Sequence, residues 1–302
     1  MLSVCIPIYN YDMRETVAHL EEEASQLPVP CEIICLDDGS DESCKAKNAS
    51  LAALSHVRYA ELPQNVGRAR VRNLLAEEAR YEYLLFLDCD SIVPDGFLAA
   101  YEALLQTKPQ VVCGGRLYAA SDSDRQHLLR YRYGVERESK RADVRSREPY
   151  RSFMTNNFLV RRDVLQAIPF DESITRYGHE DTLFGYRLMQ AHIPIQHIEN
   201  PVVNGDVETN AIFLHKTQEG VRSLCGIYRR MGADPDFVSQ VSLLRFYTKV
   251  RCAHLLWLVS GAFTLLRKSF EWGFTTGRCT NMRLFSFYKL GLFARLERHP
   301  ES

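Results

Sequence analysis

Long apolar runs and clustered cysteines are both missing from this sequence of 302 residues, and each absence excludes a class of protein. The longest nearly continuous apolar run covers fifteen residues, from 252 to 266, whereas a helix needs about 20 to cross a bilayer. The nine cysteines are scattered without a C-x-x-C pair, so neither a zinc site nor a disulfide framework is indicated. We therefore expect a reducing compartment, with an N-terminal strand that leaves no room for a signal peptide.

A strong net charge is also missing, so the overall charge does not indicate a nucleic-acid binder. The formal net charge is −1, and hydrophobic residues at 46% with charged residues at 25% are ordinary for a soluble globular protein. The length suffices for one large α/β domain or two modest ones. The charge is nevertheless uneven, because residues 222–302 hold thirteen Lys and Arg against five Asp and Glu.

An apolar run that ends in two carboxylates is the most informative stretch. Tyr83 to Leu87 has the length and composition of a strand, and it leads into Asp88 and Asp90. Alternation along a strand places these two acids on the same side. Such a pair is costly to bury without a cation, and Mg²⁺ or Mn²⁺ suits oxygen ligands. The alternative is a pair of solvated loop acids.

The first third of the chain has a β-α-β-α pattern, which predicts a parallel sheet with right-handed crossovers. Ligands in such sheets bind beyond the carboxyl ends of the strands, where Asp37 and Asp38 lie. The alternative for these acids is a turn with a helix N-cap. The elements that we expect are a strand over 2–10 with pairing ended by Pro7, a helix over 14–27, a strand over 32–36 and a helix over 42–54.

Three arginines follow the third expected strand, which covers residues 57–62. Arg68, Arg70 and Arg72 cannot all share one face of a helix, so at most one or two reach the strand ends, where cations could meet a diphosphate. A solvated helix start is the expected role of Arg70. Further on we expect strands over 111–115 and 153–160, partial helix with a mobile loop over 122–150, and an edge strand over 193–198.

A second pair of acids, Glu180 and Asp181, stands at the first turn of an amphipathic helix. The helix dipole favours acids there, which is a sufficient structural reason for them. Alternatively, one of the two accepts a proton in a pocket.

The C-terminal part after about residue 217 is predicted to be almost entirely helical. Its apolar run over 252–266 is flanked by basic residues, and we expect a packed helix there. The alternative is a helix lying at an anionic membrane surface, which the basic balance supports. The flanking residues are Lys249, Arg251, Arg267 and Lys268.

Five motifs, given at the end of this paragraph in chain order, resemble those of the family 2 glycosyltransferases, and the resemblance covers residues 2–215. The resemblance implies an inverting enzyme of the α/β class with the GT-A fold, a Rossmann-like, mostly parallel sheet flanked by helices, here with a helical C-terminal extension. It divides the chain into a nucleotide-sugar-binding half (1–120), an acceptor-binding and catalytic half (121–216) and a helical region (217–302). The motifs are Ser3 to Asn10, Asp37 to Ser40, Asn65 to Gly67 with Arg72-Asn73, Asp88 to Asp90, and Gly178 to Asp181.

The resemblance also implies roles for individual residues. Asp90 would bind Mn²⁺ or Mg²⁺ directly, with Asp88 nearer the ribose or a metal-bound water. Asp181 would be the catalytic base, with Glu180 as an acceptor-binding neighbour or the reserve candidate. The residues implied to hold the nucleotide are Pro7, Tyr9, Asp38, Asn65, Arg72 and Asp88.

One position departs from the family pattern. Related enzymes often have a histidine metal ligand shortly after an Asn-Pro segment, but Asn204 stands at that place here and His215 lies further on. The sequence therefore leaves the third protein ligand open.

The expected reaction moves a sugar from a nucleotide-diphosphate sugar, with UDP favoured, to a hydroxyl of a saccharide or lipid-linked saccharide. The resemblance implies bacterial surface polysaccharide synthesis in the cytoplasm, at the inner face of the membrane. Contact of the basic C-terminal helices with anionic lipid is the alternative to a packed helix, and no nucleic acid is expected as a partner.

Three other interpretations compete with this one. A haloacid dehalogenase-type phosphatase would continue with Gly-Thr after the second acid, whereas Ser91 and Ile92 follow here. A nucleotidyltransferase would need a Gly-rich, Arg-containing loop after the first strand, which residues 9–13 do not form. A non-catalytic nucleotide- or saccharide-binding protein would not need four acids together, namely Asp38, Asp88, Asp90 and Asp181.

Overall fold

The computed structural model describes residues 1–119 and 124–299, which fall into two compact units. Each unit is described by itself. The predicted division at residues 120 and 216 concerns functional halves and stays a prediction. The first unit comprises Met1–Ala119, Ser139–Thr175 and Leu183–Asp206, and the second comprises the described parts of Ala120–Glu138, Arg176–Thr182 and Val207–Ser302.

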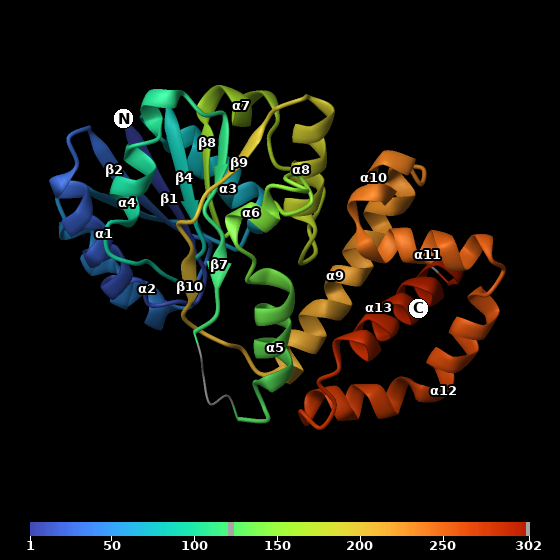
Figure 1. Cartoon of the computed structure of the whole chain (residues 1–302). Helices are drawn as coiled ribbons and strands as arrows, with labels where there is room; N and C mark the ends of the chain where they lie inside the picture. The colour runs from blue at the N-terminus through green and yellow to red at the C-terminus, as the bar shows by residue number, and fades with distance from the viewer. Residues whose placement is uncertain (120–123, 300–302) are drawn as a thin grey trace. The chain divides into compact units, whose positions relative to one another are not determined.

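A seven-stranded sheet forms the centre of the first unit. Its strands are β1 (Leu2–Ile8), β2 (Cys31–Asp37), β3 (Val57–Glu61), β4 (Tyr83–Leu87), β6 (Val111–Cys113), β8 (Asn157–Arg161) and β9 (Ile195–His197). They lie in the order β3-β2-β1-β4-β8-β6-β9, so the expected edge position of β9 is confirmed. Figure 1 labels five of them, β2, β1, β4, β8 and β9. Among the described strands of this large sheet, β8 alone runs against its neighbours, and the sheet is mostly parallel as predicted.

Helices cover both faces of this sheet. Successive side chains of each strand point to opposite faces, so each strand contributes to two cores. Val4 and Ile6 of β1 belong to the core under one face, and Cys5 belongs to the core under the other. The first core includes side chains of α1 (Arg14–Gln26) and α4 (Phe97–Glu102), and the second includes side chains of α3 (Arg68–Glu78), α7 (Arg162–Ala167) and α8 (Glu180–Gln190).

A second, three-stranded sheet belongs to the same unit. It consists of β5 (Ser91–Ile92), β10 (Val202–Asn204) and β7 (Arg116–Leu117), with β10 in the middle. β10 pairs antiparallel to β5 and parallel to β7. This small sheet joins the segment after β4 to two segments that are far away in the sequence, and it therefore shapes the surroundings of Asp90.

Three expected boundaries were wrong. Pro7 does not end pairing, because it lies within β1 opposite Leu36. The helix expected over 42–54 is α2 (Glu42–Asn48) followed by a 3₁₀ segment (Ala49–Ala53). The strand expected from residue 153 begins at Asn157. The polar region over 122–150 is partly helical as predicted, with α5 (Leu128–Tyr133), a π-helical segment (Gly134–Glu138) and α6 (Ala142–Arg145) in its described part.

The second unit contains α5, the π-helical segment and the long C-terminal helices, which confirms the helical C-terminal region. Its core is aromatic, and the rings of Phe213 and Phe285 stack with centroids 5.5 Å apart. The packed helix expected over 252–266 was wrong in two respects. α11 ends at Cys252 and His254 adopts a φ of +56° before α12 begins, and Phe263 is the one buried residue of this stretch. The C-terminal helices are α9 (Asn210–Arg230), α10 (Pro235–Gln240), α11 (Ser242–Cys252), α12 (Leu256–Thr275) and α13 (Met282–Arg298).

Within residues 1–119 and 124–299, no single helix is long and apolar enough to cross a membrane. Only α11 and α12 counted together meet both criteria, and these two helices are bent by 119° at the break between them.

Candidate active site

The parallel strands of the large sheet end at one edge, and the predicted nucleotide-binding residues follow those ends. Tyr9 follows β1, Asp38 follows β2 and Asp88 follows β4. Asn65 precedes α3, and Arg72 lies within it. Four separate segments therefore supply the predicted residues, and their arrangement matches the general position of ligands in open α/β sheets.

Asp38 ties two of the sequence motifs together. Its carboxylate accepts hydrogen bonds from the backbone N–H of Val66 at 2.7 Å and of Gly67 at 3.2 Å. Burial raises the pKa of Asp38, although these two backbone donors act in the opposite direction. The alternative of a turn with a helix N-cap holds in part: the Asp37 carboxylate accepts from the backbone N–H of Ser40 at 2.7 Å, as in a turn, but the residue that caps α2 is Asp41.

Gly39 allows the loop after β2 to approach the loop that contains Asn65. Its φ is +72°, and a Cβ at this position would lie 2.5 Å from the backbone nitrogen of Asn65. The loop after β1 joins the same cluster, since the backbone N–H of Asn10 donates to the Ser40 hydroxyl at 2.8 Å. Next to it, Tyr9 is exposed and is available to a ligand, whereas Pro7 is partly buried inside β1.

Arg72 is the arginine that reaches the strand ends, as the helix geometry allowed. It is almost fully buried, and its Nη2 donates to Oδ1 of Asp88 at 2.7 Å. Burial acts to raise the pKa of Asp88, but the guanidinium groups of Arg72, Arg68 and Arg116 outweigh it, and the pKa lies below its usual range. Asp88 therefore stays charged, and Arg70 makes outward ion pairs with acids, as expected.

Asp90 is held by two residues from the small sheet. Oδ2 of Asp90 accepts hydrogen bonds from Nη2 of Arg116 and from Nδ2 of Asn204, the latter at 2.9 Å. Asn204 is the residue that stands where the family pattern often has a histidine. The structure thus brings this position to the predicted metal ligand. Arg116 is a residue that the sequence analysis missed.

Two oxygen atoms at Asp90 suit a hard cation. Oδ1 of Asp90 and Oδ1 of Asn204 are both buried, and neither accepts a hydrogen bond from the described residues. Carboxylate and amide oxygens are the ligands that Mg²⁺ and Mn²⁺ prefer. Within residues 1–119 and 124–299, no three His, Cys, Asp or Glu side chains gather as a metal site, so the amide oxygen of Asn204 would be needed beside the carboxylates.

Glu180 and Asp181 belong to the second unit by their contacts, and they occupy the first turn of α8 as predicted. The Asp181 carboxylate accepts from the backbone N–H of Thr182 at 2.6 Å and from its hydroxyl at 3.2 Å. The preceding His179 has a φ of +70°. Burial lowers the pKa of His179 to about 4, so the ring is neutral near pH 7. The role of Asp181 as base stays a prediction.

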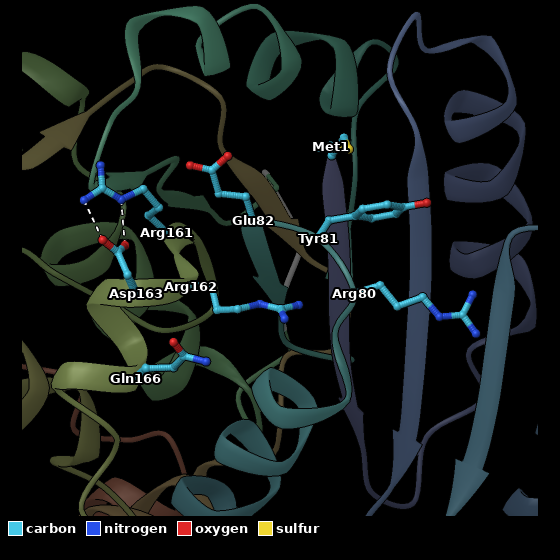
Figure 2. A pocket seen from close by; sticks show the side chains of 8 residues that line it. All are labelled: Met1, Arg80, Tyr81, Glu82, Arg161, Arg162, Asp163 and Gln166. Atoms are coloured by element: carbon cyan, nitrogen blue, oxygen red, sulfur yellow. Dashed lines mark hydrogen bonds and ion pairs between the residues drawn. The ribbon is translucent and has the colours of Figure 1, made fainter.

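A cavity of about 690 Å³ lies elsewhere in the first unit (Figure 2). It is lined by residues before β4, by the end of β8 and by Met1, which places it at the opposite edge of the sheet from Asp38 and Asp88. Arg161 and Asp163 in its wall form a bidentate ion pair at 2.6 and 2.7 Å. None of the predicted site residues lines this cavity.

Comparison with known protein families identifies the class of this chain. The model of the family "Glycosyl transferase family 2" matches residues 3–168, which include the strand ends and Asp38, Asp88 and Asp90. The chain belongs to glycosyl transferase family 2. The resemblance seen in the motifs is therefore confirmed, and the phosphatase and nucleotidyltransferase interpretations are displaced.

Several curated proteins are similar to this chain at low identity. An uncharacterized glycosyltransferase, YfnE of Bacillus subtilis, is 24% identical over 280 residues, covering 74% of this chain and 71% of the relative. Glycosyltransferase GlyG of Streptococcus pneumoniae is 31% identical over 127 residues, covering 41% of each chain. Chondroitin synthase of Escherichia coli is 27% identical over 62% of this chain, which spans only 32% of that longer protein.

A solved structure confirms the fold of this family 2 chain. Mannosyltransferase PcManGT from Pyrobaculum calidifontis, in complex with GDP-Man and Mn²⁺, superimposes with a TM-score of 0.61 at 16% identity. The alignment covers 100% of this chain and 88% of the mannosyltransferase. The predicted GT-A fold with a helical C-terminal extension is therefore confirmed.

Proposed function

We propose that this family 2 glycosyltransferase is an inverting enzyme that transfers a sugar from a UDP-sugar to a hydroxyl of a saccharide or lipid-linked saccharide. One observation carries the proposal: charged, hydrogen-bonded carboxylates stand at the carboxyl ends of parallel strands, where Arg72 holds Asp88 and Asn204 reaches Asp90. Carboxylates at this place could hold a divalent cation, and the positive charge of that cation would stabilise a leaving diphosphate.

The donor is held by the cluster that Asp38 organises. Asp38 fixes the loop with Asn65, and Tyr9 leaves an aromatic face open beside it. We assign the base and ribose of the nucleotide to these three residues and Pro7. Arg72 keeps the carboxylate of Asp88 ionised, and we assign Asp88 to the ribose side of the donor.

Asp90 and Asn204 would hold the metal, because both present a buried oxygen without a described hydrogen-bond donor. A bound Mn²⁺ or Mg²⁺ ion would supply positive charge where the diphosphate leaves. Asp88 would reach this ion through water. The mannosyltransferase neighbour, which was solved with Mn²⁺, supports this choice of metals.

Asp181 is the proposed base for the acceptor. The acceptor oxygen attacks the anomeric carbon from the face opposite the diphosphate, and its proton passes to the Asp181 carboxylate. The bond between the anomeric carbon and the diphosphate oxygen breaks, and its electron pair leaves with UDP. One displacement inverts the configuration. Glu180 would bind the acceptor beside Asp181.

We place the enzyme in the bacterial cytoplasm at the inner face of the membrane, in the synthesis of a surface polysaccharide. Relatives named chondroitin synthase in Escherichia coli and hyaluronan synthase in Pasteurella multocida support a polysaccharide product. Fractionation of cells that express the chain would test the location, and recovery only in the soluble fraction would contradict the membrane site.

The proposed reaction is tested with a panel of nucleotide sugars. We expect UDP and one UDP-sugar to raise the melting temperature only when Mn²⁺ or Mg²⁺ is present, and that sugar to be consumed with release of UDP. Proton NMR of the product should show a β linkage from an α-linked donor. Binding without consumption of any donor, hydrolysis included, would favour the non-catalytic alternative, and retention of configuration would overturn the single displacement.

A further inference from the structure

Both tryptophans of the chain lie exposed on α12. Trp257 is 67% exposed and Trp272 is 56% exposed, and the sequence holds two tryptophans in all. Between them, Leu258 is 52% exposed and Leu265 is 81% exposed. Single exposed apolar residues are ordinary, but two tryptophans and two leucines on one helix form a patch that needs an explanation.

These side chains share one side of the helix. Leu265 follows Trp257 by eight residues and precedes Trp272 by seven, which is close to two turns in each case. Leu258 borders this line. Lys268 falls within it and is also exposed. We call these five residues the α12 outer face.

The opposite side of α12 already fills the core of its own unit. Phe263 and Phe274 are fully buried, and their rings lie 5.6 Å and 5.7 Å from the ring of Tyr288 on α13. The helix is therefore apolar on two sides. Packing within the unit accounts for one side only, and the exposed fractions show that the described chain leaves the other side open to solvent.

The surroundings of the outer face are strongly basic. From residue 242 to residue 298 the chain has ten Lys and Arg against two Asp and Glu. One of these two acids, Glu271, is paired with Arg267 at 2.8 Å. The guanidinium of Arg278 lies 4.7 Å from the ring centroid of Trp272, so a cation stands directly at the edge of the patch.

We propose that the α12 outer face docks on an anionic lipid surface, with the helix lying in the plane of the interface. Tryptophan favours the level of the lipid headgroups, and lysine can extend its ammonium to the phosphates while its stem stays in apolar surroundings. Basic residues beside the patch add attraction to anionic lipid. This surface uses none of the residues assigned to donor, metal or base, so it goes beyond the proposed reaction.

Charge decides between lipid and a second copy of the chain as the occupant. Two copies joined through this face would bring the same basic groups together, and like charges repel across a desolvated interface. An anionic membrane reverses the sign of that interaction. In-plane docking also suits the 119° bend between α11 and α12, which interrupts the apolar length that a spanning helix would need.

Tryptophan fluorescence tests the proposal directly, because every tryptophan of the chain lies on the outer face. The full-length protein is titrated with vesicles of phosphatidylcholine alone and with vesicles that contain 30% phosphatidylglycerol. We expect a blue shift and protection from acrylamide quenching with the anionic vesicles only, and weaker binding as salt is raised. Unchanged emission with anionic vesicles would overturn the proposal.

Matched variants locate the contact while keeping both tryptophans. Leu265→Ser and Lys268→Glu should each lower the partition coefficient for anionic vesicles by about fivefold or more. Ile212→Ser on α9 and Lys47→Glu on α2 remove an exposed apolar and a basic side chain elsewhere, and they should leave binding unchanged. Circular dichroism and melting temperature confirm that each variant is folded.

Two outcomes would reject lipid docking at this face. Equal binding by Leu265→Ser, Lys268→Glu and the control variants would show that another surface contacts the lipid. A blue shift without lipid, accompanied by a concentration-dependent rise in mass in light scattering, would show that a second copy covers the outer face.

Discussion

The two groups of acids in this molecule are held in different ways. In the first unit, Asp88 is fixed by the guanidinium of Arg72 and Asp90 by Arg116 together with Asn204. At the start of α8, Asp181 is oriented by the backbone N–H and the hydroxyl of Thr182, within a single turn of helix. The first group is held by side chains from other elements, among them two arginines, whereas Thr182, the next residue in the chain, supplies two donors to Asp181.

The ion pairs of the first group match the role that is proposed for it. Cations lower the pKa of Asp88 and keep it charged, which suits a group that binds a nucleotide or an ion and never takes a proton. A general base has to accept a proton during the reaction, so it should be positioned without being locked in its charged form. The predictions below separate the two groups, starting with the largest effect.

Replacing the proposed base should break turnover and spare the donor. We expect Asp181→Asn to lower kcat by roughly 10²–10⁴-fold, because the amide cannot take the acceptor proton, while the Kd for UDP with Mn²⁺ stays within about twofold. Steady-state kinetics and calorimetry measure the two quantities. Asp236→Asn, an exposed acid in the first turn of α10, is the matched control. If turnover stays near wild type, Asp181 is not the base and Glu180→Gln is the next variant.

A side chain at Gly39 should destabilise the protein, because it would push apart the two loops that meet at the proposed donor site. Gly39→Ala puts a Cβ 2.5 Å from the backbone nitrogen of Asn65 at a φ of +72°. We expect a loss of about 3 kcal/mol in the free energy of unfolding, from positive-φ strain and overpacking together. Gly96→Ala is the control, since it has a φ of +74° and no neighbour within 4 Å, and it should cost about 1 kcal/mol. Equal losses in denaturant unfolding would mean that the contact is unimportant.

The turn before Asp181 should make stability depend on pH. The pKa of His179 falls from 6.5 to about 4 on folding, chiefly because burial disfavours the charged imidazolium. The carboxylate of Glu180 acts to raise this pKa, and the ammonium of Lys289 acts to lower it. Between these values the unfolded chain binds a proton that the folded chain does not, so stability falls as the pH falls from 6.5 to 4. Since His179 is partly exposed, we expect a change of about 2 kcal/mol at most.

The matched variant for this pH dependence is His179→Asn, because asparagine tolerates the positive φ and does not titrate. Urea unfolding at pH 7 and pH 4.5 should show a smaller difference for the variant than for the wild type. Parallel pH profiles of the two proteins would assign the acid sensitivity to other groups.

Removing the positive charge of Arg116 should increase the affinity of the proposed metal site for Mn²⁺. Arg116→Gln takes away a positive charge that occupies Oδ2 of the proposed ligand, so the affinity for Mn²⁺ should rise by about tenfold. Titration of free Mn²⁺ by electron paramagnetic resonance measures this change. Arg14→Gln, which removes the partner of the exposed Asp12, is the control. A weaker affinity in Arg116→Gln would show that the guanidinium supports the metal site instead of competing for it.

The sequence predicted the elements that depend on local periodicity. The strands that lead into Asp38 and Asp88 are short apolar runs followed by acids. Helical spacing limited the arginines at the strand ends to one or two of three, and the family resemblance selected Arg72. The prediction that Pro7 ends the pairing of the first strand was wrong, because a proline lacks a single backbone N–H and can stay in a strand where that donor is not needed. The pairing of β1 with β4 ends at Cys5, so no donor is needed on that side at Pro7.

The surroundings of Asp90 could not be derived from local patterns. Arg116 lies on a strand of two residues, and Asn204 lies on one of three residues about ninety positions later. Their pairing in the small sheet is a long-range event that leaves no periodic signal. Sequence position alone singled out Asn204, through the departure from the family pattern, whereas nothing in the sequence marked Arg116.

The central claim is that the strand-end carboxylates of the first unit form a metal-dependent UDP site. Isothermal titration of UDP into the wild type and into Asp90→Asn, with Mn²⁺ and with EDTA, tests it directly. Asp95→Asn, which alters a fully exposed acid nearby in the sequence, is the control. We predict that Mn²⁺ strengthens UDP binding by the wild type and by the control and has no effect on Asp90→Asn. Equal Mn²⁺-assisted affinity in all three proteins would contradict the account.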